Sequence, residues 1–230
     1  MSPKLYWKSL NSLLFPRACI ACDKTLIEQE EFICIECSFF LPFSNTRKGI
    51  DNHVEKKFWG KIIFESAYSV FDMKYSDRVY KIIHKIKYKN QPKIAYNIGK
   101  IFGQYQREKE WLQNIDIILP IPLHNRKKRK RGYNQSLYFA KGLAQSTNIP
   151  VHNKVLKRKV FTISQTQKSR LDRYENMENV FQCMDPRAIY NKHLLIVDDV
   201  ITTGATLLSA GQTLRNETSC KLSFLAIGNA

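Results

Sequence analysis

Apolar side chains recur at intervals of three or four residues in several stretches of the chain, which is the spacing of an amphipathic helix. The clearest example follows Ser76, a residue type that caps helix N-termini. Its apolar face consists of Val79, Ile82, Ile83 and Ile86. The same spacing predicts further helices over 94–105, 137–144 and 207–214. A short amphipathic helix is also predicted over 6–14, and Pro16 ends it.

Short apolar runs alternate with these helices. They lie at 62–73, 115–119, 194–200 and 221–227. Runs of this length fit strands, and the third run is apolar enough to be buried on both faces of a sheet. The alternation of strand and helix predicts an α/β domain with a mainly parallel sheet flanked by helices.

Four of the six cysteines form two closely spaced pairs. They are Cys19, Cys22, Cys34 and Cys37. Each Cys-x-x-Cys knuckle can place two thiolates on one metal ion, so the two together predict a small ribbon around a structural Zn²⁺ with no open coordination position. Disulfides and a thioredoxin-type redox motif are the alternatives, and two paired knuckles without a signal peptide fit zinc better. We interpret Cys183 and Cys220 as small buried apolar residues.

A polar, irregular stretch separates the cysteines from the α/β pattern. Residues 41–57 include Pro42, Gly49 and several Ser, Asn and Asp residues. We place the domain boundary there, with an N-terminal helix and zinc-ribbon module over 1–57 and the α/β domain over 58–230. Since the module is too small to bury a core by itself, we expect it to dock on the larger domain.

The charge balance adds a prediction about partners. The 230 residues include 37 Lys and Arg against 20 Asp and Glu, a formal net charge of +17. This excess favours phosphate-rich ligands, nucleic acid or anionic lipid, and a generally basic surface is the alternative. A hydrophobic content of 43% excludes wholesale disorder. Because no apolar run approaches the roughly 18 residues of a membrane span and no signal-peptide core is visible, we expect a cytoplasmic protein.

Chemistry-bearing residues gather where the most apolar strand is expected to end. Asp198 and Asp199 stand there, followed by Thr202, Thr203, Gly204, Ala205 and Thr206 at the start of a helix. Ligands of open α/β sheets bind beyond the carboxyl ends of the strands. Helix N-terminal amides and threonine hydroxyls suit a phosphate, and a glycine permits its close approach. The two carboxylates suit a neutral diol or a divalent cation, so ribose 5-phosphate would satisfy both ends.

The run 196–206 resembles the phosphoribosyl pyrophosphate (PRPP) signature of type I phosphoribosyltransferases. Nearly the whole chain is similar to the ComF family, the ComFC or GntX-like proteins associated with bacterial competence, with 41–61 the weakest part. In that family a cysteine-rich zinc ribbon precedes a phosphoribosyltransferase domain, which is the order found here. The segments PIPL at 120–123 and RGYNQ at 131–135 also resemble the family's PxPL…RG(F/Y)NQ pattern.

This resemblance implies roles for individual residues. Asp198 and Asp199 would bind the ribose diol, directly or through water on Mg²⁺, and 202–206 would hold the 5′-phosphate. Pyrophosphate would be gripped by a basic loop, although a solvated charge run is the alternative. The residues of that loop are Arg126, Lys127, Arg131 and Gly132. A mobile hood that closes over PRPP in related enzymes corresponds to 158–173. Its candidate residues are Gln165, Arg170 and Arg173.

Two classes of function remain open. One is an enzyme that transfers a phosphoribosyl group from PRPP to an unidentified acceptor. The other is a non-catalytic module on the same fold that binds single-stranded DNA or regulates its uptake, together with DNA-uptake or recombination proteins. Hypoxanthine–guanine enzymes carry an Asp where Thr202 stands, so the resemblance disfavours that purine chemistry, and no residue is nominated as general base.

Overall fold

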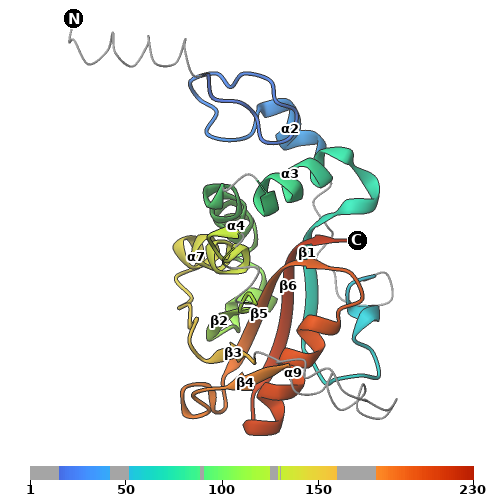
Figure 1. Cartoon of the computed structure of the whole chain (residues 1–230), viewed down its shortest axis with the longest axis vertical. Helices are drawn as coiled ribbons and strands as arrows, with labels where there is room; N and C mark the ends of the chain where they lie inside the picture. Colours follow the sequence, from blue (N-terminus) through green and yellow to red (C-terminus); the bar gives the residue numbers. More distant parts are fainter. Residues whose placement is uncertain (1–15, 42–51, 89–90, 125–128, 130, 160–179) are drawn as a thin grey trace, which may run out of the picture.

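A four-stranded parallel sheet forms the centre of the computed structural model, which describes residues 16–41, 52–88, 91–124, 129, 131–159 and 180–230 (Figure 1). The strand order is β1 (Ser66–Asp72), β6 (Lys221–Asn229), β5 (His193–Ile201) and β2 (Ile117–Pro120). All three pairings are parallel. The predicted strands and the predicted parallel sheet are therefore confirmed, whereas the helix predicted over 6–14 lies outside the described residues.

Helices cover both faces of this sheet. One face packs against α3 (Asp77–Tyr88), α4 (Pro92–Gln106), α5 (Glu110–Gln113) and α7 (Gln135–Thr147). The other packs against α9 (Ala205–Glu217) and a small antiparallel pair, β3 (Leu156–Arg158) and β4 (Phe181–Cys183). Short 3₁₀ turns are η1 (Glu55–Lys57), η2 (Met73–Tyr75) and η3 (Arg187–Ile189).

Strand β6 shows why consecutive apolar residues suit such a sheet. Leu225 and Ile227 join the core under α3, α4 and α7, whereas Phe224 and Ala226 join the core under α9. Successive side chains of a strand point to opposite faces, so a strand covered on both sides needs apolar residues at every position.

Helices α4 and α7 approach closely through glycines. A Cβ at Gly99 would overlap the backbone oxygen of Phe139, and one at Gly142 would overlap the backbone oxygen of Tyr96. This close crossing fixes the position of α7, whose N-terminus lies beside the carboxyl end of β5.

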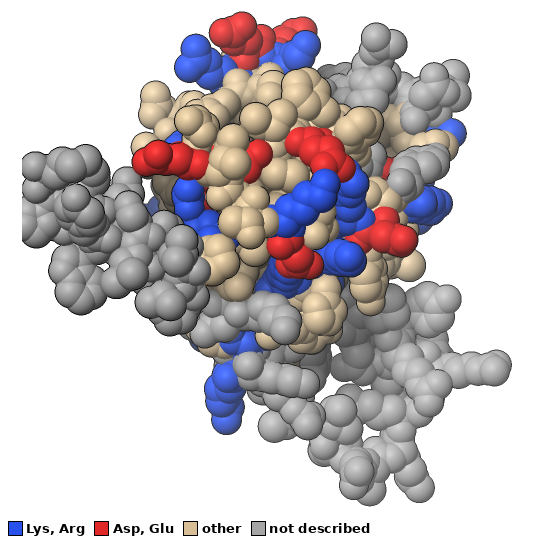
Figure 2. All heavy atoms as spheres, turned by 90° about the horizontal axis from the view of Figure 1, so that it is seen from above, with Lys and Arg blue, Asp and Glu red and all other residues tan. Residues whose placement is uncertain are grey.

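The cysteine module docks on α3, as predicted from its size. Module residues share one core with α3 and α4 residues, including Ile20 and Ile82. Ion pairs join Arg78 to Glu36 at 3.2 Å and Lys85 to Asp23 at 2.6 Å. From above, acidic and basic side chains lie next to one another on this part of the surface (Figure 2). The excess positive charge therefore does not form a uniform patch on this face of the described chain.

Residues just before the predicted boundary also contact the sheet. The side-chain amide of Asn52 donates to the backbone oxygen of Ala67 at 3.0 Å, and Phe58 stacks on Phe224 with ring centroids 4.5 Å apart. The division at residue 57 stays a prediction, and this segment brings Lys57 and Phe58 to the corner described below. Among the described helices, none is both long and apolar enough to cross a membrane.

Candidate functional site

The acidic pair lies inside the last part of β5. The strand continues through both aspartates to Ile201 because β6 runs alongside it as far as Asn229. Asp198 and Asp199 therefore stand on paired backbone near the carboxyl end of β5, at the strand end where the sequence predicts them. The pairing with β6 defines the backbone from which both carboxylates extend.

The carboxylate of Asp198 is held by two donors. Its Oδ1 accepts a hydrogen bond from Ser136 Oγ at 3.1 Å and one from the backbone N–H of Asp199 at 2.8 Å. Burial, followed by the neighbouring charge of Asp199, raises the pKa of Asp198 to about 7. At neutral pH this group is therefore divided between its protonated and ionised forms.

The carboxylate of Asp199 faces two cations. Its Oδ2 lies 3.6 Å from Arg131 Nη1 and 3.8 Å from Lys87 Nζ. The side chains are largely screened from solvent, with exposed fractions of 19% for Asp199, 15% for Arg131 and 23% for Lys87. Both separations exceed hydrogen-bond length, so the attraction is that of a charge cluster. The structure thus brings together a residue predicted for the ribose and one predicted for the pyrophosphate.

The connection from β5 to α9 forms a turn above Phe58. Gly204 is the N-cap of α9 at φ +81°, and a Cβ there would lie 3.2 Å from ring carbons of Phe58. Glycine is needed for both reasons, since its conformation is left-handed and its space is filled. Thr202 and Thr203 are exposed, and Thr203 Oγ1 accepts from the N–H of Ala205 at 3.4 Å. The first turn of α9, with Ala205 and Thr206, therefore opens toward solvent beside the acidic pair.

Lys57 ties this turn to the end of β6. Its ammonium group donates to the backbone oxygen of Thr202 and to that of Ala230, the latter at 3.0 Å. Burial, with a contribution from nearby Lys74, lowers the pKa of Lys57. These two contacts link the backbone of the turn to the residue that follows β6.

The basic loop falls between β2 and α7, as predicted. Arg131 and Gly132, the latter at φ +77°, precede Asn134, which caps α7 by accepting from the N–H of Ser136 at 3.2 Å. The remaining predicted residues lie outside the described part of the chain. They are Arg126, Lys127, Gln165, Arg170 and Arg173.

Two residues of the corner were not predicted from the sequence. Lys87 reaches Asp199 from the last turn of α3, and Ser136 reaches Asp198 from the first turn of α7. The signals were weak, namely a lysine-rich end of a predicted helix and a serine directly after the RGYNQ segment.

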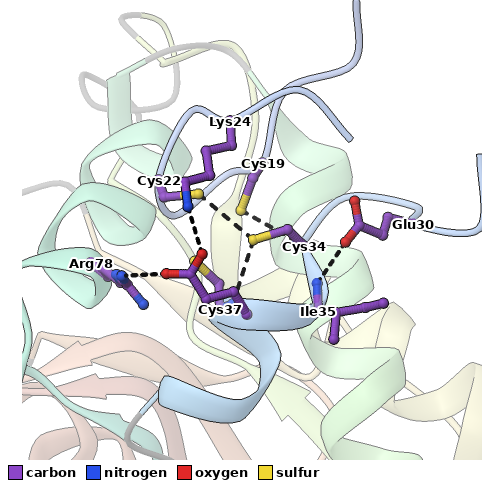
Figure 3. A network of polar contacts seen from close by, with 9 residues as sticks. Cys19, Cys22, Lys24, Glu30, Cys34, Ile35, Cys37 and Arg78 are labelled. Atoms are coloured by element: carbon purple, nitrogen blue, oxygen red, sulfur yellow. Dashed lines mark hydrogen bonds and ion pairs between the residues drawn. The ribbon is translucent and has the colours of Figure 1, made fainter. Parts of the chain in front are cut away.

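The four predicted metal ligands converge in the cysteine module (Figure 3). The sulfur atoms of Cys19, Cys22, Cys34 and Cys37 all lie within 4.8 Å of one another. Cys34 caps α2 (Ile35–Phe40), and its sulfur accepts from the N–H of Cys37 at 3.4 Å. The carboxylate of Glu30 fixes the knuckle by accepting from the N–H of Ile35 at 2.7 Å (Figure 3).

This geometry fits a metal ion. Tetrahedral coordination with Zn–S bonds of about 2.3 Å separates the sulfurs by about 3.8 Å, and Cys22 and Cys34 are 3.7 Å apart. Burial raises the pKa of the Cys19 thiol, but backbone N–H groups, that of Cys34 first, outweigh it and bring the pKa to about 7. Burial also raises the pKa of Cys34 and of Cys37. The cluster can hold a metal ion through four sulfur atoms.

Several known proteins are similar to this chain. Competence protein F of Haemophilus influenzae is 30% identical over 138 residues, which span 58% of this chain and 60% of that protein. DNA utilization protein YhgH of Salmonella typhimurium is 27% identical over 200 residues, which span 85% of this chain and 83% of that protein. The chain thus spans about 60% of the length of the Haemophilus relative.

Distant solved structures and a family profile also match parts of the chain. The glutamine PRPP amidotransferase from B. subtilis is 17% identical, with a TM-score of 0.42 over 62% of this chain and 30% of that one. The profile described as the phosphoribosyl transferase domain matches residues 86–227, which is more than half of the chain and includes β5, the turn after it and α9. The protein is therefore a member of the phosphoribosyl transferase domain family.

Proposed function

We propose that this protein binds PRPP, or a related phosphorylated ribose, at the carboxyl edge of β5. The observation that carries the proposal is the meeting, at one corner, of two strand-borne carboxylates, an open helix N-terminus and two cations. A phosphate needs amide and cationic donors, whereas a sugar diol needs carboxylate acceptors. A phosphorylated ribose carries both groups, so it requires both kinds of surroundings within the length of one sugar.

The 5′-phosphate is assigned to the turn after β5. Backbone N–H groups in the first turn of α9 lack partners within the helix, and the helix dipole favours an anion there. The hydroxyl groups of Thr202, Thr203 and Thr206 supply further donors, and the exposed, small side chain of Ala205 leaves room for the phosphate oxygens.

The ribose and the pyrophosphate are assigned to the charge cluster. Arg131 and Lys87 stand 3.6 and 3.8 Å from Asp199, so a pyrophosphate can draw both cations into charge-assisted bonds of about 2.7–2.9 Å. Asp199 would then accept from the ribose diol together with Asp198. The two carboxylates also form a hard oxygen donor set that suits Mg²⁺, which when bound would neutralise charge on the leaving pyrophosphate.

Calorimetric titration of PRPP in the presence of Mg²⁺ tests this assignment. We expect the double substitution Asp198→Asn with Asp199→Asn to abolish binding, because amide groups neither attract Mg²⁺ nor accept as strongly from a diol. Glu108→Gln is the matched control. This substitution also removes a carboxylate, but from a side chain that is 84% exposed and is not one of the residues assigned to the site. Unchanged affinity in the double variant would refute the proposal.

For the cysteine cluster we propose a structural Zn²⁺. Four sulfur ligands leave no position for a substrate, and the 3.7 Å sulfur–sulfur distance matches the tetrahedral expectation. Metal analysis of the purified protein should give one zinc per chain.

A second proposed function is the handling of single-stranded DNA during DNA uptake in the cytoplasm, with DNA-uptake or recombination proteins as partners. It is favoured by the relatives named Competence protein F and DNA utilization protein, and by the net charge of +17. Binding to oligothymidylate should weaken steeply with salt if phosphates are contacted. Affinity that stays flat across salt would speak against this function.

A further inference from the structure

Helix α3 carries an exposed row of aromatic rings. Tyr80, His84 and Tyr88 are four residues apart, so they share one face of the helix. Tyr80 is 61% exposed and Tyr88 is 60% exposed, and His84 is exposed as well. The ring centroids of Tyr80 and His84 are 6.5 Å apart, and those of His84 and Tyr88 are 4.8 Å apart. The three rings form one continuous row.

This row is not needed to hold the helix in place. The opposite face of α3 carries the residues that anchor it in the core, among them Val79, Ile82 and Ile86. An exposed pair of rings at this spacing adds only about 0.2–0.5 kcal/mol to a helix. Three large rings left in water therefore point to a ligand that supplies faces for them to stack on.

The charges around the row favour a polyanion. Within α3 a single acid, Asp77, stands against four bases, and Lys81 is exposed beside Tyr80. At the other end the guanidinium carbon of Arg131 lies 5.7 Å from the centroid of Tyr88. Arg78 and Lys85 are less available, because they pair with Glu36 at 3.2 Å and Asp23 at 2.6 Å, and Lys87 lies 3.8 Å from Asp199. Lys81 is therefore the base of α3 that stands free to meet a ligand beside the row.

We infer that Tyr80, His84 and Tyr88 form a stacking surface for single-stranded DNA, with Lys81 and Arg131 next to its phosphates. This inference rests on the proposed DNA-handling function and gives it a location. Unpaired bases offer faces that rings can stack on, whereas the bases of a duplex are already stacked on one another. The row ends at Tyr88, beside Arg131 and Lys87. A single-stranded DNA bound along the row therefore lies next to the site around Asp199 that is assigned to PRPP.

Fluorescence anisotropy with a labelled oligothymidylate tests the surface. Each ring removed by Tyr80→Ala or Tyr88→Ala should weaken binding roughly tenfold, and the double variant about a hundredfold. The slope of log affinity against log salt should stay as in the wild type, because no cation is lost. Lys81→Gln should instead reduce that slope by about 0.7.

Tyr190→Ala is the matched control. Its ring is also 61% exposed, but Tyr190 precedes the amino end of β5, whereas the candidate site lies at the carboxyl end of that strand. Thermal unfolding of each variant is monitored by circular dichroism. We expect equal midpoint temperatures, because alanine favours the helical conformation and the helix therefore stays intact. The affinity of Tyr190→Ala should match that of the wild type.

The outcomes separate the surface from the function. A wild-type protein without affinity for oligothymidylate refutes DNA handling itself. Wild-type binding that Tyr80→Ala and Tyr88→Ala leave unchanged refutes the stacking surface alone. Duplex DNA bound as tightly as the single strand, and weakened equally in the variants, also refutes stacking.

Discussion

The carboxyl group of Asp198 should make the protein less stable as the pH rises. Its pKa stands at about 7 in the folded protein, raised mainly by burial from an ordinary value of 3.8. Between these values the folded chain keeps a proton that the unfolded chain releases, so the free energy of unfolding falls with pH. The contribution is fully present below pH 3.8 and is lost once the pH exceeds about 7.

The size of this effect follows from the shift. One pKa unit corresponds to about 1.36 kcal/mol, so the whole shift corresponds to about 4 kcal/mol. From pH 5 to pH 8 the loss should be about 3 kcal/mol, because ionisation is complete only above the folded pKa. Asp198→Asn removes the titration and keeps an oxygen for both donors, Ser136 Oγ and the N–H of Asp199.

Urea unfolding of the wild type and of Asp198→Asn at pH 5 and pH 8 measures this contribution. The stability difference between the two proteins should shift by about 3 kcal/mol in favour of the variant as the pH is raised. Groups common to both proteins cancel in that comparison, including the cysteines and His193. A difference that is the same at both pH values would refute the reasoning, since Asp198 would then ionise alike in the folded and unfolded chains.

Three further predictions concern the turn, its support and the metal. Gly204→Ala should cost about 1 kcal/mol more in urea unfolding than Gly60→Ala, because both glycines have positive φ but only the first faces a ring, at 3.2 Å. Equal costs would contradict the close packing. Phe58→Ala should lower stability by about 3–5 kcal/mol, since this fully buried ring stacks on β6, and a loss below 1 kcal/mol would contradict that. Cys37→Ser should lower the zinc content measured by plasma emission, whereas Cys183→Ser should retain one zinc per chain.

The sequence predicted every strand of the main sheet and the long helices on both faces, because each buries a regular apolar pattern. It missed β3 and β4, which have three residues each. Such short strands show no periodicity, and their pairing joins segments on either side of 160–179. Only the tertiary fold brings them together.

In the candidate site, too, the residues that follow one another in the sequence were predictable, and the contacts made only by tertiary packing were not. Asp198, Asp199 and the turn after them were predictable because one strand, one turn and one helix start carry them in sequence order. The contacts of Lys87 and Ser136 with this pair were not, because α3 and α7 reach the corner only through packing. The pKa of Asp198 likewise depends on burial by elements far away in the chain.

The place where the family match begins has a practical consequence. Residue 86 lies inside α3, so a shortened protein covering only 86–227 would lack β1 and most of that helix. Strand β6 would then lose one of its two neighbours and become an edge strand with unpaired backbone amides and carbonyls, which favours aggregation. Deletion studies on this protein should keep at least the residues from about 52 onward. The side chain of Asn52 hydrogen-bonds to Ala67 in β1 and thereby holds the segment that leads into this strand.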